Sequence, residues 1–100
     1  PDAEQPPVAR AALEAAAPNP FNARTNLAFA VPGDGRATLR LFDVRGRLVR
    51  TLQDGPLPPG RHGYDWDGRD DGGRPLPSGP YFYRLEAGGE SLTGRCALVK

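Results

Sequence analysis

The chain has 100 residues, of which 38% are hydrophobic, and a chain of this length can bury the core of one domain without a metal or a disulfide. Its 13 basic and 12 acidic residues leave a formal net charge of +1, and their interspersed signs give no field that would attract nucleic acid. We therefore expect no nucleic-acid partner, and no transmembrane segment either, because no apolar run approaches the ~20 residues that cross a bilayer.

The N-terminal part, residues 1–16, is predicted to be an extended arm or linker ahead of a domain that spans 17–100. Residues 1–7 are polar and contain three prolines, a composition typical of an extended chain. The alanine-rich run 8–17 is ambiguous: it favours a helix by propensity but is too short to be stable alone, and as a strand it would be a weak edge. Since the chain contains no Met and begins at Pro1, we expect a fragment or a mature form, with a cleaved export signal as our hypothesis.

Beyond residue 24, large apolar side chains alternate with polar ones, which is the period of a strand with one buried face. Six strands are predicted, over residues 25–31, 37–42, 48–52, 62–66, 81–86 and 92–99. Val49 and Leu52 depart from strict alternation, and a bulge would place them on one face. Phe21 lies in a turn rich in Asn and Pro and is predicted to close one end of the core.

The segment 65–85 joins two strands rich in aromatic residues. His62, Tyr64 and Trp66 alternate with small or polar residues before a turn of Gly, Pro and Asp, and Tyr81 and Tyr83 alternate after it. Because the turn is too polar to bury, we expect a long hairpin or a connection that crosses between sheets. With the doubtful N-terminal strand, about seven strands are spaced as in an all-β antiparallel sandwich of two sheets.

The only carboxylate cluster lies in this segment and consists of Asp65, Asp67, Asp70 and Asp71. Ca²⁺ binds several such oxygens at once, so the cluster is a weak calcium candidate. The spacing does not match the helix-loop-helix calcium pattern, because Arg69 stands where a ligand would help and no Glu closes the loop. Asp is also common in turns, where its side chain caps backbone amides. A structural turn is therefore favoured, and we expect neither a metal nor a cofactor.

Nucleophilic catalysis finds little support in the sequence. His62 is the only histidine, which excludes metal sites built from several His ligands, and neither Ser78 nor Ser91 lies in a Gly-x-Ser-x-Gly setting. Cys96 is the only cysteine and shares a strand face with Leu residues, so a buried structural thiol is favoured over a reactive or intermolecular one. We therefore expect that the chain is not an enzyme.

Four sequence blocks together resemble a known family. They stand at 18–22 (PNPFN), 41–49 (LFDVRGRLV), 66–74 (WDGRDDGGR) and 77–85 (PSGPYFYRL). In order and spacing they are similar to the immunoglobulin-like domain of the flagellar hook-capping protein, and equally to the C-terminal domains that type IX secretion uses as sorting signals. The resemblance implies an immunoglobulin-like, or fibronectin III-like, sandwich. It also implies an exported bacterial protein at the cell surface or outside the cell, with a role in assembly, display or sorting.

From these observations we expect a non-catalytic structural module of a bacterial surface filament or appendage. It would form a homo-oligomer or polymer in which the N-terminal arm adds to an open sheet edge of a neighbour. The alternative is a sorting or anchoring domain that is covalently linked to a larger secreted cargo protein. The candidate interface residues are Val8, Arg10, Ala12 and Leu13 in the arm, and Phe42, Val44, Phe82 and Val99 on the outward phase of their strands.

Overall fold

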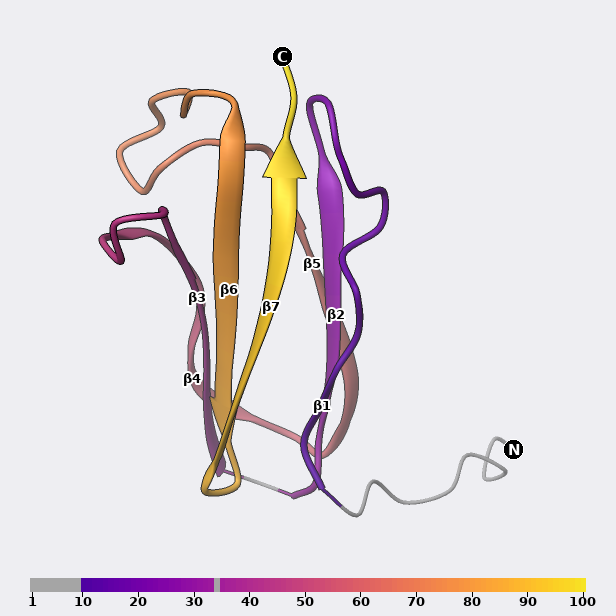
Figure 1. The fold of residues 1–100 in the computed structure, drawn as a ribbon. Coiled ribbons are helices and arrows are strands. Elements are labelled where there is room, and N and C mark those ends of the chain that lie inside the picture. The colour runs from indigo at the N-terminus through magenta and orange to yellow at the C-terminus, as the bar shows by residue number, and fades with distance from the viewer. Residues whose placement is uncertain (1–9, 34) are drawn as a thin grey trace.

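The computed structural model describes residues 10–33 and 35–100, which fold into two antiparallel sheets packed face to face (Figure 1). The three-stranded sheet has the order β1-β2-β5, with β1 at Ala12–Leu13, β2 at Thr25–Val31 and β5 at Gly60–Trp66. The four-stranded sheet has the order β4-β3-β6-β7, with β4 at Leu48–Leu57, β3 at Gly35–Phe42, β6 at Gly79–Ala87 and β7 at Glu90–Leu98. The prediction of an all-β immunoglobulin-like sandwich is confirmed.

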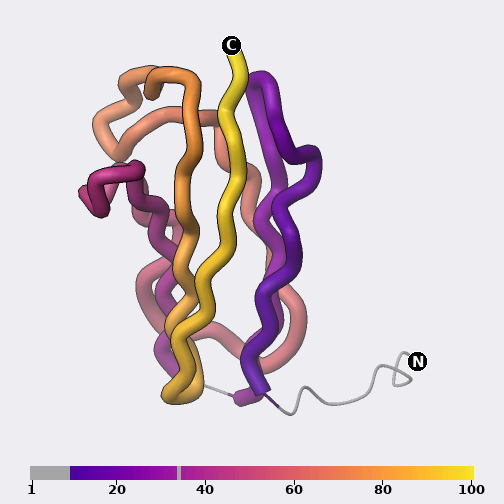
Figure 2. Tube along the Cα trace, in the orientation of Figure 1, coloured from indigo at the N-terminus to yellow at the C-terminus, as the bar shows by residue number. Residues whose placement is uncertain are grey.

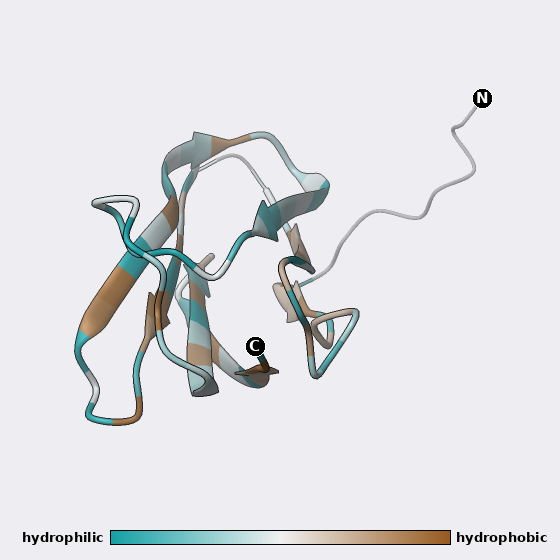
Figure 3. Cartoon of the chain, turned by 90° about the horizontal axis from the view of Figure 1, so that it is seen from above, coloured by the Kyte–Doolittle hydropathy of each residue, from teal (hydrophilic) through white to brown (hydrophobic). Residues whose placement is uncertain are grey.

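The core lies between the sheets, because alternate side chains of each strand point inward. This alternation appears as brown and teal segments along the strands when the sandwich is seen from above (Figure 3). Trp66 is fully buried, with its ring centroid 5.5 Å from that of Phe21 and 5.4 Å from that of Tyr81. Phe21 is 2% exposed and closes one end of the core, as predicted. Burying each such ring contributes roughly 2 to 3 kcal/mol relative to leaving it in water.

The polar segment after β5 crosses from one sheet to the other, since β5 and β6 belong to different sheets. Of the two predicted forms, the structure therefore has the sheet-crossing connection. The strand β4 is longer than predicted, because it continues beyond residue 52 to Leu57, through Gly55 and Pro56. Pro cannot donate to a ladder, but β4 is an edge strand, where such a residue is tolerated. The predicted bulge is confirmed by two register shifts between β3 and β4.

Residues 10–21, which we call the strap, run along the side of the sandwich where both sheets end (Figure 2). The strap first pairs with the three-stranded sheet, through Ala12 opposite Ala30. It then crosses to the four-stranded sheet, where Phe21 forms a parallel bridge with Leu98. In its described part, the ambiguous alanine-rich run is therefore an edge strand and not a helix. Residues 10–16 of the predicted arm lie on the sandwich itself.

Candidate interaction surfaces

A tyrosine of the four-stranded sheet holds the strap in place. Tyr83 lies opposite Gly94 across the β6–β7 ladder, and a Cβ built on Gly94 would stand only 2.4 Å from Tyr83 Cζ. The ring crosses β7 because Gly94 has no side chain. Beyond β7, the Tyr83 hydroxyl accepts a hydrogen bond from the Ala16 amide at 3.0 Å and donates one to the Glu14 carbonyl at 3.3 Å. Burial raises the pKa of this hydroxyl above its ordinary value, so it stays protonated and can donate.

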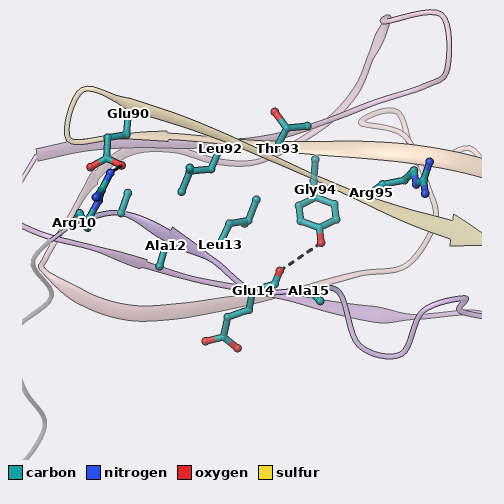
Figure 4. A pocket seen from close by; sticks show the side chains of 12 residues that line it. Arg10, Ala12, Leu13, Glu14, Ala15, Glu90, Leu92, Thr93, Gly94 and Arg95 are labelled. Carbon is teal, nitrogen blue, oxygen red and sulfur yellow. Dashed lines mark hydrogen bonds and ion pairs between the residues drawn. The ribbon is translucent and has the colours of Figure 1, made fainter.

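A groove of about 650 Å³ separates the strap from β7, with Arg10 and Glu90 at one end and Arg95 near the other (Figure 4). The end is marked by an ion pair of 3.8 Å between Arg10 and Glu90. Leu13 and Leu92 are partly buried against the core below. We call this cavity the strap groove.

The strap closes only part of the β7 edge. Near the end of the strand, Phe21 pairs with Ala97 and Val99 through two backbone bonds of 2.9 Å, and the Asn19 side chain bonds to the backbone of Arg95 and Ala97. Because backbone groups alternate sides along a strand, those of Ser91 and Thr93 point away from β6 in the same way. No backbone partner within residues 10–33 and 35–100 reaches them.

The arm residues predicted to meet a neighbour have different positions. Val8 lies outside the described residues. Arg10, Ala12 and Leu13 line the strap groove. The backbone of Ala12 and Leu13, however, pairs with β2 of the same chain. One side of β1 is therefore paired within its own sandwich, and a contact of these residues with another copy stays a prediction.

A second surface lies on the outer face of the four-stranded sheet. The register aligns four side chains in one row across all four strands: Leu48, Phe42, Phe82 and Arg95. Val44, in the turn after β3, is 66% exposed and lines the same hollow of about 360 Å³ as Phe42 and Phe82. We call Leu48, Phe42, Phe82 and Val44 the aromatic row. The structure thus brings three of the predicted outward residues together, whereas Val99 does not line this hollow and lies past the end of β7.

The next row on this face is cationic. Arg40 and Arg84 lie directly opposite each other, an arrangement that costs stability when like charges are uncompensated. Three nearby groups offset it: Glu86 lies 3.7 Å from Arg40 and 3.9 Å from Arg84, Asp54 lies 3.6 Å from Arg40, and the Arg84 guanidinium stands 4.5 Å above the Phe42 ring. We call Arg40 and Arg84 the arginine row.

The carboxylates of the calcium candidate accept hydrogen bonds from backbone amides and from Asn26, or form ion pairs with arginine. Asp70 accepts hydrogen bonds of 2.9 Å from the amides of Gly72 and Arg74, and Asp71 accepts one of 3.1 Å from Thr51. Arg50 approaches Asp67 at 3.5 Å and Asp71 at 3.7 Å. Asp65 accepts from the Asn26 side chain at 3.0 Å. Within the described ranges, no three His, Cys, Asp or Glu side chains gather in a way that could hold a metal ion.

The remaining chemical candidates serve structure. Cys96 is 1% exposed, and burial raises the pKa of its thiol to about 11, so the reactive thiolate is disfavoured at neutral pH. The predicted buried thiol is confirmed. The His62 ring lies with Nε2 2.9 Å from the Pro58 carbonyl, and the Ser78 hydroxyl accepts from the Lys100 amide at 3.0 Å. Among the described residues there is no helix with the length and apolar character needed to span a membrane.

Comparison with known proteins relates this sandwich to a described domain family. A family model described as the FlgD Ig-like domain matches residues 17–91. The basal-body rod modification protein FlgD of Salmonella typhimurium is 38% identical over 66 residues, which cover 64% of this chain and 28% of that protein. The chain therefore spans well under a third of the length of the curated relatives that it matches. The predicted resemblance to the hook-capping family is confirmed.

Two solved structures from Porphyromonas gingivalis share the fold. Dimeric latent PorU superposes with a TM-score of 0.70 at 20% identity, covering 89% of this chain and 9% of PorU. PorZ, a bacterial surface component of the type IX secretion system, superposes with a TM-score of 0.63 at 18% identity, covering 88% of this chain and 11% of PorZ. At these identities the likeness establishes a common sandwich and leaves function to other evidence.

Proposed function

The chain belongs to the FlgD Ig-like domain family, and on that premise we propose that it is a non-catalytic module that joins its neighbours in an exported bacterial assembly. The relative it matches is named a basal-body rod modification protein, and we propose that this chain contributes binding surfaces to an assembly of that kind. The described side chains agree with such a role, because the thiol is buried and the clustered carboxylates cap backbone amides.

We further propose that the module associates with copies of itself through its N-terminal segment, and the strap carries this proposal. Because residues 10–21 are bound to the two sheets of their own sandwich, we assign the contact of the predicted arm with a neighbour to residues 1–9. The expected polymer is a head-to-tail one, since an arm that binds a different surface on the next copy forms a contact that need not close.

Deleting residues 1–9 tests the proposal, because the deletion leaves every described strand intact. The full chain should show concentration-dependent association in sedimentation velocity, whereas the deleted chain should sediment as a monomer with an unchanged melting temperature. A chain whose first nine residues are scrambled is the matched control and should also be monomeric. Equal association of the full and deleted chains would contradict the role of this segment.

We propose a location outside the cell or on its surface, as expected for a part of an exported assembly. Protease treatment of intact cells that make the protein is the test. The module should be degraded while a cytoplasmic marker survives. Complete protection on intact cells, followed by cleavage after lysis, would place the module inside.

The second candidate function is a sorting or anchoring module of a larger secreted protein. It is favoured by the four sequence blocks at 18–22, 41–49, 66–74 and 77–85, which look equally like the type IX sorting domains. Fusing the chain to the C-terminus of a periplasmic reporter in a bacterium with type IX secretion should then carry the reporter to the surface. A reporter that stays in the periplasm would leave the assembly role as the function.

A further inference from the structure

We propose that the aromatic row and the arginine row on the outer face of the four-stranded sheet bind residues 1–9 of a second copy of this chain. The inference rests on the proposed function, because it names the surface that receives the N-terminal segment. It also gives a role to Val44 and Leu48, which are 66% and 50% exposed and do not line the strap groove.

The chemistry of the segment is complementary to this face. The sequence 1–9 (PDAEQPPVA) carries two carboxylates, Asp2 and Glu4, no basic side chain, and an apolar run formed by Pro6, Pro7 and Val8. Proline-rich segments bind to hollows lined by aromatic rings, with little loss of backbone entropy. Carboxylates bind to arginine through charge-assisted hydrogen bonds. The segment thus carries an apolar run that suits the aromatic row and carboxylates that suit the arginine row.

The face presents these groups side by side. Phe42 and Phe82 lie next to each other across the β3–β6 ladder and line a hollow of about 360 Å³. Arg84 borders the hollow, and Arg95 lies opposite Phe82 on β7. Arg95 is exposed and forms no ion pair within residues 10–33 and 35–100. Arg95 lines the strap groove and not the hollow, and Asp43, which lines the hollow itself, is already bound by Arg47. An incoming carboxylate would therefore find Arg84 and Arg95 near apolar side chains, a combination that is common at binding hot spots.

The distances along the chain favour a second copy over the same copy. Arg10 is paired with Glu90, at the start of β7, whereas the aromatic row lies level with Arg95. Five strand residues separate these levels, which is roughly 17 Å. Val8 is two residues from Arg10 and extends about 7 Å from it, whereas Pro6 is four residues away and extends about 14 Å. Even when fully extended, the apolar run falls short of the level of its own aromatic row, which favours the row of a neighbour.

The face is poorly suited to pack against an identical face. With two copies related by a twofold axis through the arginine row, Arg40 and Arg84 of one copy would meet the same residues of the other. Like charges brought together in this way are disfavoured. A separate acidic segment avoids this repulsion, which is a further reason to assign the face to residues 1–9.

Charge reversal in the full chain tests the proposal. Arg95→Glu should weaken association about fivefold in sedimentation equilibrium, and Glu4→Lys should weaken it by a similar factor, since each change removes one partly exposed ion pair and adds a repulsion. The double variant, which restores the opposite charges, should associate within about twofold of the original chain. Phe82→Thr should weaken association about tenfold or more, because the apolar contact is lost.

The control is Arg24→Glu, which makes the same change of charge at an exposed residue in the loop before β2 and should leave association unchanged. All variants should keep the original melting temperature to within a few degrees, which separates loss of binding from loss of fold.

The outcomes distinguish this inference from the proposed function. If deleting residues 1–9 abolishes association but Arg95→Glu and Phe82→Thr do not weaken it, the segment binds elsewhere: the inference fails and the proposed function stands. If the deletion has no effect, or the full chain is monomeric at millimolar concentration, both fail. Failure of the double variant to restore binding would also overturn the pairing of Glu4 with Arg95.

Discussion

The two sheets of the sandwich end along two sides, and different contacts join the sheets on each side. On the β4/β5 side, the chain passes directly from Leu57 to Gly60, and residues 67–71 contact the edge of β4. On the β1/β7 side, the strap and β7 come from opposite ends of the sequence. The Tyr83 ring joins them in the middle of the strap, and Phe21 and Asn19 join them near its end. Each side has one tyrosine tie, since the Tyr64 hydroxyl donates to Gln53 between β5 and β4. The Tyr64 bond is dispensable because the chain itself joins β4 to β5. The Tyr83 bond forms only because Gly94 has no side chain in the path of the ring.

The largest effect is expected from filling the space at Gly94. Gly94→Ala should lower the free energy of unfolding by about 3 kcal/mol, because a Cβ 2.4 Å from the Tyr83 ring forces the ring and the strap to move. Gly63→Ala in β5 is the matched control. Its Cβ would meet nothing closer than 3.5 Å, so its effect should stay within about 0.5 kcal/mol. Urea unfolding measures both, and equal losses would show that the two sides are alike.

Alkaline pH should also weaken the β7 side. Burial raises the pKa of Cys96 from 9.0 to about 11, and that of Tyr83 above its ordinary value. A pKa raised in the folded state stabilises the fold below the pKa of the unfolded chain, and this contribution disappears as the pH rises through the folded value. The melting temperature should therefore be constant below pH 9 and fall up to about pH 11, by the equivalent of about 2 kcal/mol from Cys96.

The variant Cys96→Ala identifies the group responsible. It should unfold more easily at neutral pH because it leaves a small cavity, but its melting temperature should change less between pH 9 and 11. An equally steep fall in this variant would assign the alkaline transition to other groups.

Removing the two hydroxyls compares the ties directly. Tyr83→Phe should cost about 1 to 2 kcal/mol, since it leaves the buried Ala16 amide without its partner. Tyr64→Phe should cost at most about 0.5 to 1 kcal/mol, because its bond to Gln53 is partly exposed to water. Hydrogen exchange supplies a second measurement, in which the Ala16 amide should exchange faster only in Tyr83→Phe. A larger loss of stability in Tyr64→Phe than in Tyr83→Phe would show that the β4/β5 side depends more on its tyrosine hydroxyl than the β1/β7 side does.

The smallest effect is expected at the turn that covers β4. Arg50→Ala should cost about 1 kcal/mol at low salt and less at high salt, since Arg50 contacts Asp67 and Asp71 in a partly exposed setting. Arg24→Ala, at an exposed residue, should leave unfolding unchanged. If Arg50→Ala lowered the free energy of unfolding as much as Gly94→Ala does, the β4/β5 side would also depend on one contact.

The strands and most of the core could be predicted because alternation is a local property of the sequence. The bounds of β2 and the burial of Trp66 and Phe21 required only residues within a few positions of each other. The extension of β4 through Pro56 could not be predicted, because a proline is tolerated there only by virtue of the edge position. Edge positions follow from sheet order, which no local pattern contains.

The interaction surfaces could be predicted only in part, because register decides them. The outward phases of Phe42 and Phe82 were evident, but Leu48 enters their row through a register shift between β3 and β4. Gly94 read as an ordinary strand residue, and its role depends on lying opposite Tyr83. A strand glycine with a long aromatic residue in the partner strand is a signal that could have found it. The pairing of the strap with β7 could not be predicted for the same reason, since the Phe21–Leu98 bridge joins residues 77 positions apart.

That parallel bridge also determines how the module carries tension. The described chain enters beside Glu90 and leaves past Leu98, at opposite ends of a body 41 Å long (Figure 1). A pull on the two termini therefore acts along the β7 edge, and it loads the bonds from Phe21 to Ala97 and Val99 in shear, all at once, rather than peeling them apart in turn. A row of such modules would resist stretching through these short bridges, and the rate at which they rupture would govern its mechanical lifetime.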